Sequence, residues 1–277
     1  MQLRIRDAFA ALIIGGFAAS AATAVVVSYD FESGVPAGTS VHGSAQVTPT
    51  GGVGNSGVLR VTQALNSQQG GFFVGSLSPD PVTQFVASLD VRIGGGTARP
   101  ADGLSFNFGS GIGPGTTGEE GTGALTISLD TWDNNGADTA PAMEIKVNGA
   151  AVAFQSFAGI REGGRAPAGP ILQDGGNNDV FLGTGNEFAQ LVVRLNSNNT
   201  MTVDYKGIRV FENVSVAGYV PQAGNFLIGA RTGGANDNHF VDNLRIAINA
   251  SAVPEPATAS LALLGLGGLM FRRRRTA

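Results

Sequence analysis

Several residue types are scarce in this 277-residue chain, and each scarcity excludes a kind of chemistry. There is no Cys, so neither a disulfide nor a thiol is available, and core packing must hold the fold, with or without a bound metal. The two His residues, His42 and His239, are too few for a His-based metal centre. No Ser stands in a nucleophile-elbow sequence, and no GxxxxGK[ST] phosphate loop occurs. Nucleophilic catalysis and nucleotide binding therefore have no support in the sequence.

The first 24 residues are organised like a secretory signal peptide. Arg4 and Arg6 form a basic start, residues 9–19 are a short apolar run, and Ala22-Thr23-Ala24 is a small-x-small cleavage site. The apolar run is too short for a stable membrane span. We expect cleavage after Ala24, which makes the chain an exported protein. A buried N-terminal helix, the alternative, would leave the cleavage site unexplained.

The last 26 residues, 252–277, combine three features. Pro254, Glu255 and Pro256 precede an apolar run at 257–271, which as a helix would be about 22 Å long against a hydrocarbon core of about 30 Å. Four positive charges follow and hold that end on the cytoplasmic side of the membrane. These charges are Arg272, Arg273, Arg274 and Arg275. A marginal transmembrane helix is predicted here, and an ordinary tail anchor is one reading of it.

The three features together resemble the PEP-CTERM sorting signal of Gram-negative bacteria. The resemblance implies recognition by an exosortase, transient insertion in the inner membrane, and cleavage near the Pro-Glu-Pro motif. It also implies release or attachment at the cell surface, in the setting of exopolysaccharide production.

Residues 25–251 remain as one domain once both ends are removed, and they carry few positive charges. They hold eleven Lys or Arg and nineteen Asp or Glu, a net charge of −8. That sign argues against nucleic acid and anionic membrane surfaces as partners.

The domain shows period-2 apolar alternation and no helical periodicity. In QFVASLDVRI, residues 84–93, every second side chain from Phe85 is apolar. GLSFNFG and GALTISLDT repeat the pattern, and turn signals such as Gly94-Gly95-Gly96 and Asn148-Gly149 separate the runs. We count about twelve to fourteen strands, which predicts an all-β, two-sheet antiparallel β-sandwich of jelly-roll type.

Two stretches, 109–123 and 159–185, are rich in Gly and poor in apolar residues. The second is long for a compact domain, and such segments are often binding loops or disordered. Within the first, Glu119 and Glu120 are most simply residues of a solvated loop.

Two short motifs give the domain a further resemblance. Ala101-Asp102-Gly103 is followed about 25 residues later by Asp130-Thr131-Trp132-Asp133-Asn134, and the domain closes with ARTGGANDNHFVDNLRI. This resembles the concanavalin A-like lectin/glucanase superfamily, and the pair of motifs resembles legume-type lectins in particular. The resemblance implies non-catalytic carbohydrate binding assisted by Ca²⁺.

By match to those lectins, the sugar-binding residues would be Asp102, Gly103, Gly121, Trp132 and Asn134. Asp102 would accept hydrogen bonds from sugar hydroxyls, and Gly121 or Gly118 would be candidates for a backbone N–H donor. The calcium ligands would be Asp130, the Trp132 carbonyl, Asn134 and, with looser spacing, Asp138. Carboxylate, amide and carbonyl oxygens are the donors that Ca²⁺ prefers.

The sequence also departs from the lectin pattern. Ser128 stands where lectins carry a Glu for a transition metal, so no second metal is expected. The ExDxxE run of the related glucanases is absent, which disfavours glycoside hydrolysis. Two plainer interpretations stay open. The segment 128–138 can be a strand followed by an Asx-rich turn that caps its own backbone, and Asp102 can be a structural residue that ties its turn.

His239 lies in a polar run with Asp237, Asn238 and Asp242. These residues could line a second ion or ligand site, or form a turn into the last strand. Glycan or exopolysaccharide binding in an extracellular matrix is the leading functional hypothesis, and a structural matrix protein without a sugar ligand is the alternative.

Overall fold

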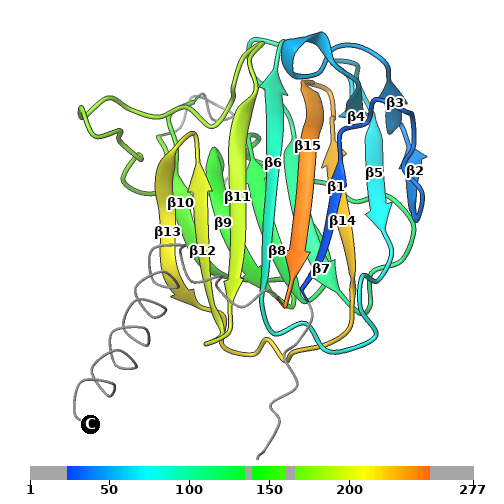
Figure 1. Ribbon diagram of the computed structural model, residues 1–277. Helices are drawn as coiled ribbons and strands as arrows, with labels where there is room; N and C mark the ends of the chain where they lie inside the picture. Colours follow the sequence, from blue (N-terminus) through cyan, green and yellow to red (C-terminus); the bar gives the residue numbers. More distant parts are fainter. Residues whose placement is uncertain (1–23, 135–138, 160–165, 250–277) are drawn as a thin grey trace, which may run out of the picture.

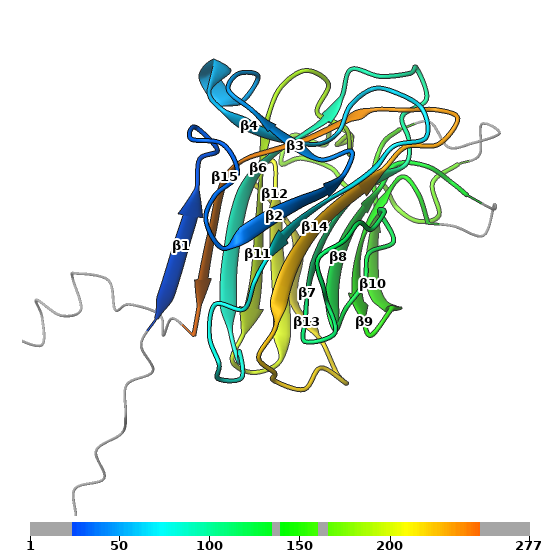
Figure 2. The same ribbon diagram turned by 90° about the vertical axis from the view of Figure 1, so that its right-hand side faces the viewer.

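Two antiparallel sheets pack face to face in this protein (Figures 1 and 2). The computed structural model describes residues 24–134, 139–159 and 166–249. The predicted sorting segment, and the predicted signal peptide except for Ala24, lie outside these ranges. No helix within them is both long and apolar enough to span a bilayer. The all-β sandwich expected from the sequence is confirmed.

The described residues form fifteen strands, slightly more than the twelve to fourteen expected. The eight-stranded sheet has the order β13 (Ile208–Ser215), β12 (Thr200–Tyr205), β11 (Ala189–Asn196), β6 (Phe85–Gly94), β15 (Asn238–Ile248), β4 (Val58–Thr62) and β3 (Gln46–Thr48), with β1 (Val25–Tyr29) also paired to β15. The seven-stranded sheet has the order β10 (Ala150–Ser156), β9 (Ala142–Val147), β8 (Leu125–Asp130), β7 (Gly103–Gly109), β14 (Asn225–Arg231), β5 (Gln69–Val74) and β2 (Thr39–Gly43). A 3-10 turn, η1 (Val53–Asn55), precedes β4.

The core lies between the sheets and is built by the predicted alternation. Along β6, every second residue from Phe85 is buried and those between are partly exposed. Phe rings from both sheets meet at the centre: Phe226 of β14 lies 4.8 Å from Phe108 of β7 and 5.5 Å from Phe85 (ring centroids). Contacts of this kind stabilise beyond the area they bury. Register is fixed because a slip by one residue would turn each apolar set outward.

The three strands β7, β8 and β9 depart from simple alternation, since every residue in them is buried. The segment between β7 and β8 folds back over the outer face of its own sheet. It approaches so closely that a Cβ on Gly71 would lie 2.1 Å from the Gly115 carbonyl oxygen, and one on Gly229 would lie 2.2 Å from Thr117 Cγ2. Only glycine tolerates such backbone approach. One consequence is that polar side chains on this face are shielded from water.

The second Gly-rich stretch is tied to the sandwich in its described part, residues 166–185. Ile171 forms an isolated bridge with Ser156, the last residue of β10, and Phe181 forms one with Ala158. Leu182 is buried, and its carbonyl accepts a 2.6 Å hydrogen bond from the Tyr205 hydroxyl. This segment therefore closes one side of the core.

Candidate functional site

The candidate site lies at the end of the seven-stranded sheet where three neighbouring segments meet. Asp102 immediately precedes β7, Trp132 and Asn134 follow β8, and Arg231 is the last residue of β14. Because β7 pairs with both neighbours, Gly103 stands opposite Asp130 on one side and Arg231 on the other. Adjacent strands are about 4.8 Å apart, so sheet pairing alone brings these distant parts of the sequence together.

A pocket of about 350 Å³ opens between these segments. Its lining consists of Asp102, Trp132, Asn134, Arg231, Thr232, Gly233 and Gly234. Three of the predicted sugar-binding residues therefore share one pocket. The last four lining residues come from the end of β14 and the turn beyond it.

Main-chain contacts fix the position of Asp102. Its N–H donates to the Arg231 carbonyl at 2.8 Å, and its own carbonyl accepts the Thr131 N–H and hydroxyl, both at 2.9 Å. The Ala101–Asp102 peptide bond is cis. Among the described residues, no hydrogen bond joins the Asp102 side chain to the backbone of this turn. Its Oδ2 instead accepts a 2.7 Å hydrogen bond from Arg231 Nε, and its Oδ1 lies near Gly233, where a Cβ would be 3.3 Å away.

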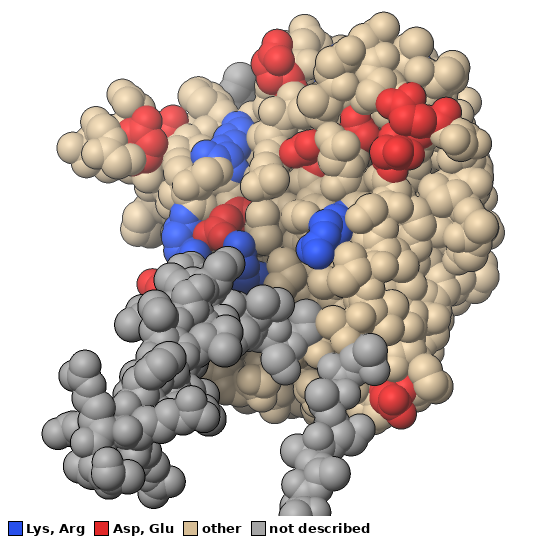
Figure 3. Space-filling model, viewed as in Figure 1, with Lys and Arg blue, Asp and Glu red and all other residues tan. Residues whose placement is uncertain are grey.

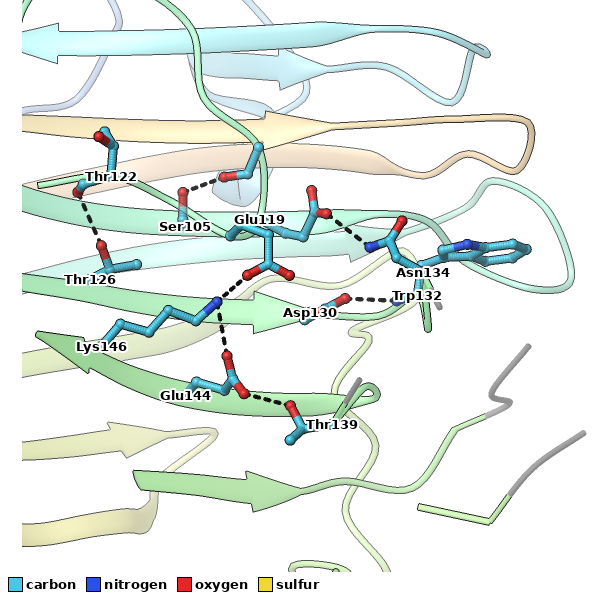
Figure 4. Close-up of polar contacts among 12 residues, drawn as sticks. Ser105, Glu119, Thr122, Thr126, Asp130, Trp132, Asn134, Thr139, Glu144 and Lys146 are labelled. Atoms are coloured by element: carbon cyan, nitrogen blue, oxygen red, sulfur yellow. Dashed lines mark hydrogen bonds and ion pairs between the residues drawn. The ribbon is translucent and has the colours of Figure 1, made fainter. Parts of the chain in front are cut away.

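Arg231 joins Asp102 to a second carboxylate, that of Glu119. Arg231 Nη2 donates to Glu119 Oε1 at 2.6 Å, and Asn134 Nδ2 lies 3.4 Å from the same oxygen (Figure 4). Glu119 is 0% exposed, so the expectation of a solvated Glu119 is wrong. The segment after β7 folds back over the sheet and places the Glu119 side chain against Gly103 and Arg231, at the end of the sheet where the pocket lies. Glu120 points the other way, to Lys146.

Burial governs the electrostatics of this group. Desolvation raises the pKa of Asp102, and Arg231 opposes the shift with its charge and hydrogen bond. Desolvation likewise raises the pKa of Glu119 against the opposing charge of Arg231. For Arg231, burial lowers the pKa, but the charges of Glu119 and Asp102 outweigh it, so the net shift is upward. The guanidinium is thus the compensating charge for two buried carboxylates.

The turn after β8 carries the predicted calcium ligands. Asp130 Oδ1 accepts the Trp132 N–H at 3.0 Å, the capping expected of an Asx turn (Figure 4). Asp130 and Asp133 are both buried. Asp138 lies outside the described residues. Within the described ranges, no three His, Cys, Asp or Glu residues are grouped so as to hold a metal.

The donor chemistry of this turn nevertheless fits Ca²⁺. Asp130 and Asn134 bring a carboxylate and an amide oxygen to one turn, and Ca²⁺ prefers carboxylate, amide and carbonyl oxygens. Asp130, Asn134 and the Trp132 carbonyl are the residues that would hold it. Calcium supplies charge compensation and order to such a turn.

The two predicted glycines lie elsewhere. The Gly121 N–H donates to the Gly118 carbonyl at 3.2 Å, and a Cβ on Gly121 would lie 2.4 Å from Asn107 Oδ1. Gly103 packs against Glu119, and a Cβ added at Gly103 would lie 2.9 Å from the Glu119 Cβ. Neither glycine lines the pocket, so the geometry brings together Asp102, Trp132 and Asn134 without them.

The polar run Asp237, Asn238, His239 and Asp242 spans the start of β15, and its side chains make structural contacts. His239 is the second residue of β15 and fully buried, with its Nδ1 2.7 Å from the Thr62 hydroxyl. Burial lowers the pKa of His239 to about 3. Asp242 caps η1 by accepting the Val53 N–H and the Ser56 hydroxyl. Asp237 accepts the Gly96 N–H and lines a second hollow of about 370 Å³, formed mainly by glycines and apolar side chains. The predicted sugar-binding and calcium-binding residues do not line this hollow.

Comparisons with known proteins agree with the two resemblances. Residues 252–275 match the family described as the PEP-CTERM protein-sorting motif. The motif indicates an exported protein that is anchored transiently in the membrane and processed at its C-terminus. No curated protein matches the chain in sequence.

Several solved lectin structures share the fold. Basic winged bean lectin with Tn-antigen has a TM-score of 0.58 at 15% identity, over 82% of this chain and 98% of that one. Lectin II from Ulex europaeus has a TM-score of 0.56 at 14% identity, over 81% and 98%. The VIP36 exoplasmic/lumenal domain, in its Ca²⁺/Man3GlcNAc-bound form, has a TM-score of 0.54 at 19% identity, over 80% and 87%. The domain therefore has the concanavalin A-like lectin fold.

Proposed function

We propose that this protein binds carbohydrate without catalysis, at the cell surface or in the extracellular matrix of a Gram-negative bacterium. An exosortase would process its C-terminal signal during export. In the pocket, Asp102 accepts hydrogen bonds from sugar hydroxyls, Trp132 offers an aromatic face, and Asn134 adds an amide. Asp130, the Trp132 carbonyl and Asn134, with Asp138 as the predicted fourth ligand, would hold a Ca²⁺ ion, which would order the turn that carries two of these residues.

The observation that carries the proposal is the convergence of Asp102, Trp132 and Asn134 in one pocket. A carboxylate, an amide and an aromatic ring are the groups that sugar binding needs, and they come from two segments about 30 residues apart. The Trp132 indole projects beyond the end of β8 (Figure 4), where a sugar ring can stack on it.

The burial of Glu119 supports binding without catalysis. Glycosidases of this superfamily use two carboxyl groups that both face the scissile bond. Asp102 lines the pocket, but Glu119, the carboxyl group linked to it through Arg231, is 0% exposed and cannot reach a substrate.

A glycan array with the full-length protein in mild detergent tests the proposal. Asp102→Ala should abolish binding, because the acceptor is lost, while the far-ultraviolet circular dichroism spectrum stays unchanged. Asp80→Ala is the matched control. Asp80 is an exposed aspartate between β5 and β6, at the opposite end of the sandwich. Retained binding in Asp102→Ala would remove Asp102 from the site.

One observation favours the second candidate, a structural matrix protein without a sugar ligand. Asp102 Oδ2 already has a partner in Arg231, so the pocket is partly satisfied from within. An empty array from a folded protein, with a melting temperature indifferent to calcium and chelator, would support this candidate.

A further inference from the structure

We infer that Arg231 sets the ligand class of the pocket, so that it accepts uncharged glycans and rejects glycans bearing carboxylate, sulfate or phosphate groups. The inference rests on the proposed carbohydrate binding and narrows it. Arg231 is the only Lys, Arg or His among the described lining residues. It is therefore the side chain that would have to bind an anion in this pocket.

The hydrogen bonds of Arg231 leave it poorly suited to bind an anion. Strong recognition of carboxylate or phosphate by arginine uses two parallel N–H groups on one edge of the guanidinium. Here Nε is bonded to Asp102 and Nη2 to Glu119, so that edge is already occupied by the protein's own carboxylates. The three N–H groups outside these two bonds, two on Nη1 and one on Nη2, stand beside the same two carboxylates, so an anion bound there would meet their negative charge.

The local charge is negative as well. Two carboxylates, Asp102 and Glu119, surround one guanidinium, and Asp130 and Asp133 lie on the adjoining turn. With both carboxylates ionised, Asp102, Glu119 and Arg231 together carry one net negative charge. An anionic sugar would therefore meet repulsion at the pocket. Figure 3 shows the other side of the sandwich, the outer face of the eight-stranded sheet, which is mostly uncharged with small groups of acidic and basic side chains.

An uncharged sugar fits the same groups well. Asp102 keeps Oδ1 on the Gly233 side, away from the Arg231 bond, as an acceptor for a hydroxyl. The small residues Gly233 and Gly234 leave room beside it, and Trp132 presents an apolar ring. Arg231 acts here as a positioning residue, because it holds the carboxylate that the hydroxyl would meet.

The test compares matched ligands that differ in charge alone. A neutral polysaccharide that binds on the array is oxidised at C6 to its uronate form, and part of that product is reduced back to the alcohol. Binding of the full-length protein is measured by calorimetry at low and high salt. The uronate form should bind at least about tenfold more weakly at low salt, the gap should narrow at high salt, and reduction should restore affinity.

Glu119→Gln gives a second readout. It removes one negative charge and weakens the hold on Nη2, so the preference for the neutral form should fall about threefold or more. Glu212→Gln on β13 changes net charge equally at an exposed position remote from the pocket and should leave the preference unchanged. The wild-type comparison does not depend on either variant.

The two hypotheses fail differently. Equal or tighter binding of the uronate form, abolished by Asp102→Ala, would overturn the charge preference and leave carbohydrate binding standing. Absence of binding to every glycan would overturn both.

Discussion

Replacing Arg231 with Met removes the guanidinium and keeps a side chain of similar length. Asp102 and Glu119 have side chains only 7% and 0% exposed, so both carboxylates would lose their compensating charge while remaining buried. Breaking a buried ion pair costs about 3–5 kcal/mol. The Arg231 side chain is itself 39% exposed, and solvent screening reduces that figure, so we expect a loss of about 2–3 kcal/mol in unfolding free energy. For a domain of this size, the melting temperature should fall by about 5–10 °C.

The pH dependence has a definite sign. Burial holds the pKa of both carboxyl groups above their ordinary values even with Arg231 present. Because Arg231 lowers both pKa values, removal of Arg231 raises them further. A carboxyl group whose pKa is raised in the folded state costs stability as pH rises, and that cost disappears once the group is protonated. The loss in Arg231→Met should therefore be largest near pH 7.5 and shrink toward pH 4.5.

Urea denaturation of wild type and Arg231→Met at both pH values checks this reasoning, and Arg231→Met/Glu119→Gln should recover part of the loss at pH 7.5. An unfolding free energy of Arg231→Met within about 0.5 kcal/mol of wild type at pH 7.5 would refute the assigned role, since ordinary surface substitutions fall in that range. A loss in unfolding free energy that is equal at the two pH values would refute it as well.

Three other substitutions test other parts of the structure. Burial raises the pKa of Asp237 to about 6, so Asp237→Asn should stabilise the protein by about 1–2 kcal/mol above pH 7 and by almost nothing at pH 4, measured by urea denaturation at both pH values. Gly229→Ala should lower the melting temperature by several degrees, because its Cβ would meet Thr117 Cγ2 at 2.2 Å and displace the covering segment; an unchanged melting temperature would contradict that close approach. Calcium should raise the melting temperature of wild type, and Asp130→Asn should remove most of that rise. A calcium response retained in Asp130→Asn would place the ion elsewhere.

The fold could be predicted because its signal is local and repeated. Alternation along β6 and β11 follows directly from one buried and one partly exposed face. The meeting of Asp102 with Trp132 and Asn134 was also within reach, since their motifs carry the family resemblance. Strand pairing then explains the meeting physically, because β7 and β8 are adjacent and in register at Gly103 and Asp130.

Arg231 and Glu119 were beyond the reach of the sequence. They are 112 residues apart. Glu119 belongs to no motif with a recognisable spacing, and the resemblance of the closing segment, residues 230–246, assigned no role to Arg231. Glu119 stands among Gly, Thr and Glu, a composition typical of a solvated loop. Its burial depends on a covering segment that only long-range packing creates, and the glycines that permit the close approach, Gly71 and Gly229, lie on other strands.

The segment between β7 and β8, which covers the outer face of the seven-stranded sheet, links the pocket to the middle of that sheet. Glu119 and Glu120 are consecutive, yet Glu119 bonds Arg231 at the pocket and Glu120 bonds Lys146 on β9. Burial lowers the pKa of Lys146, but its bonds to Glu120 and Glu144 outweigh this, so the amine stays charged and holds the segment down. The position of the Arg231 guanidinium, and with it the orientation of the Asp102 carboxylate, therefore depends on an ion pair outside the pocket. A rigid sheet with a fastened covering segment can keep a pocket preorganised in this way, although residues from loops line much of it.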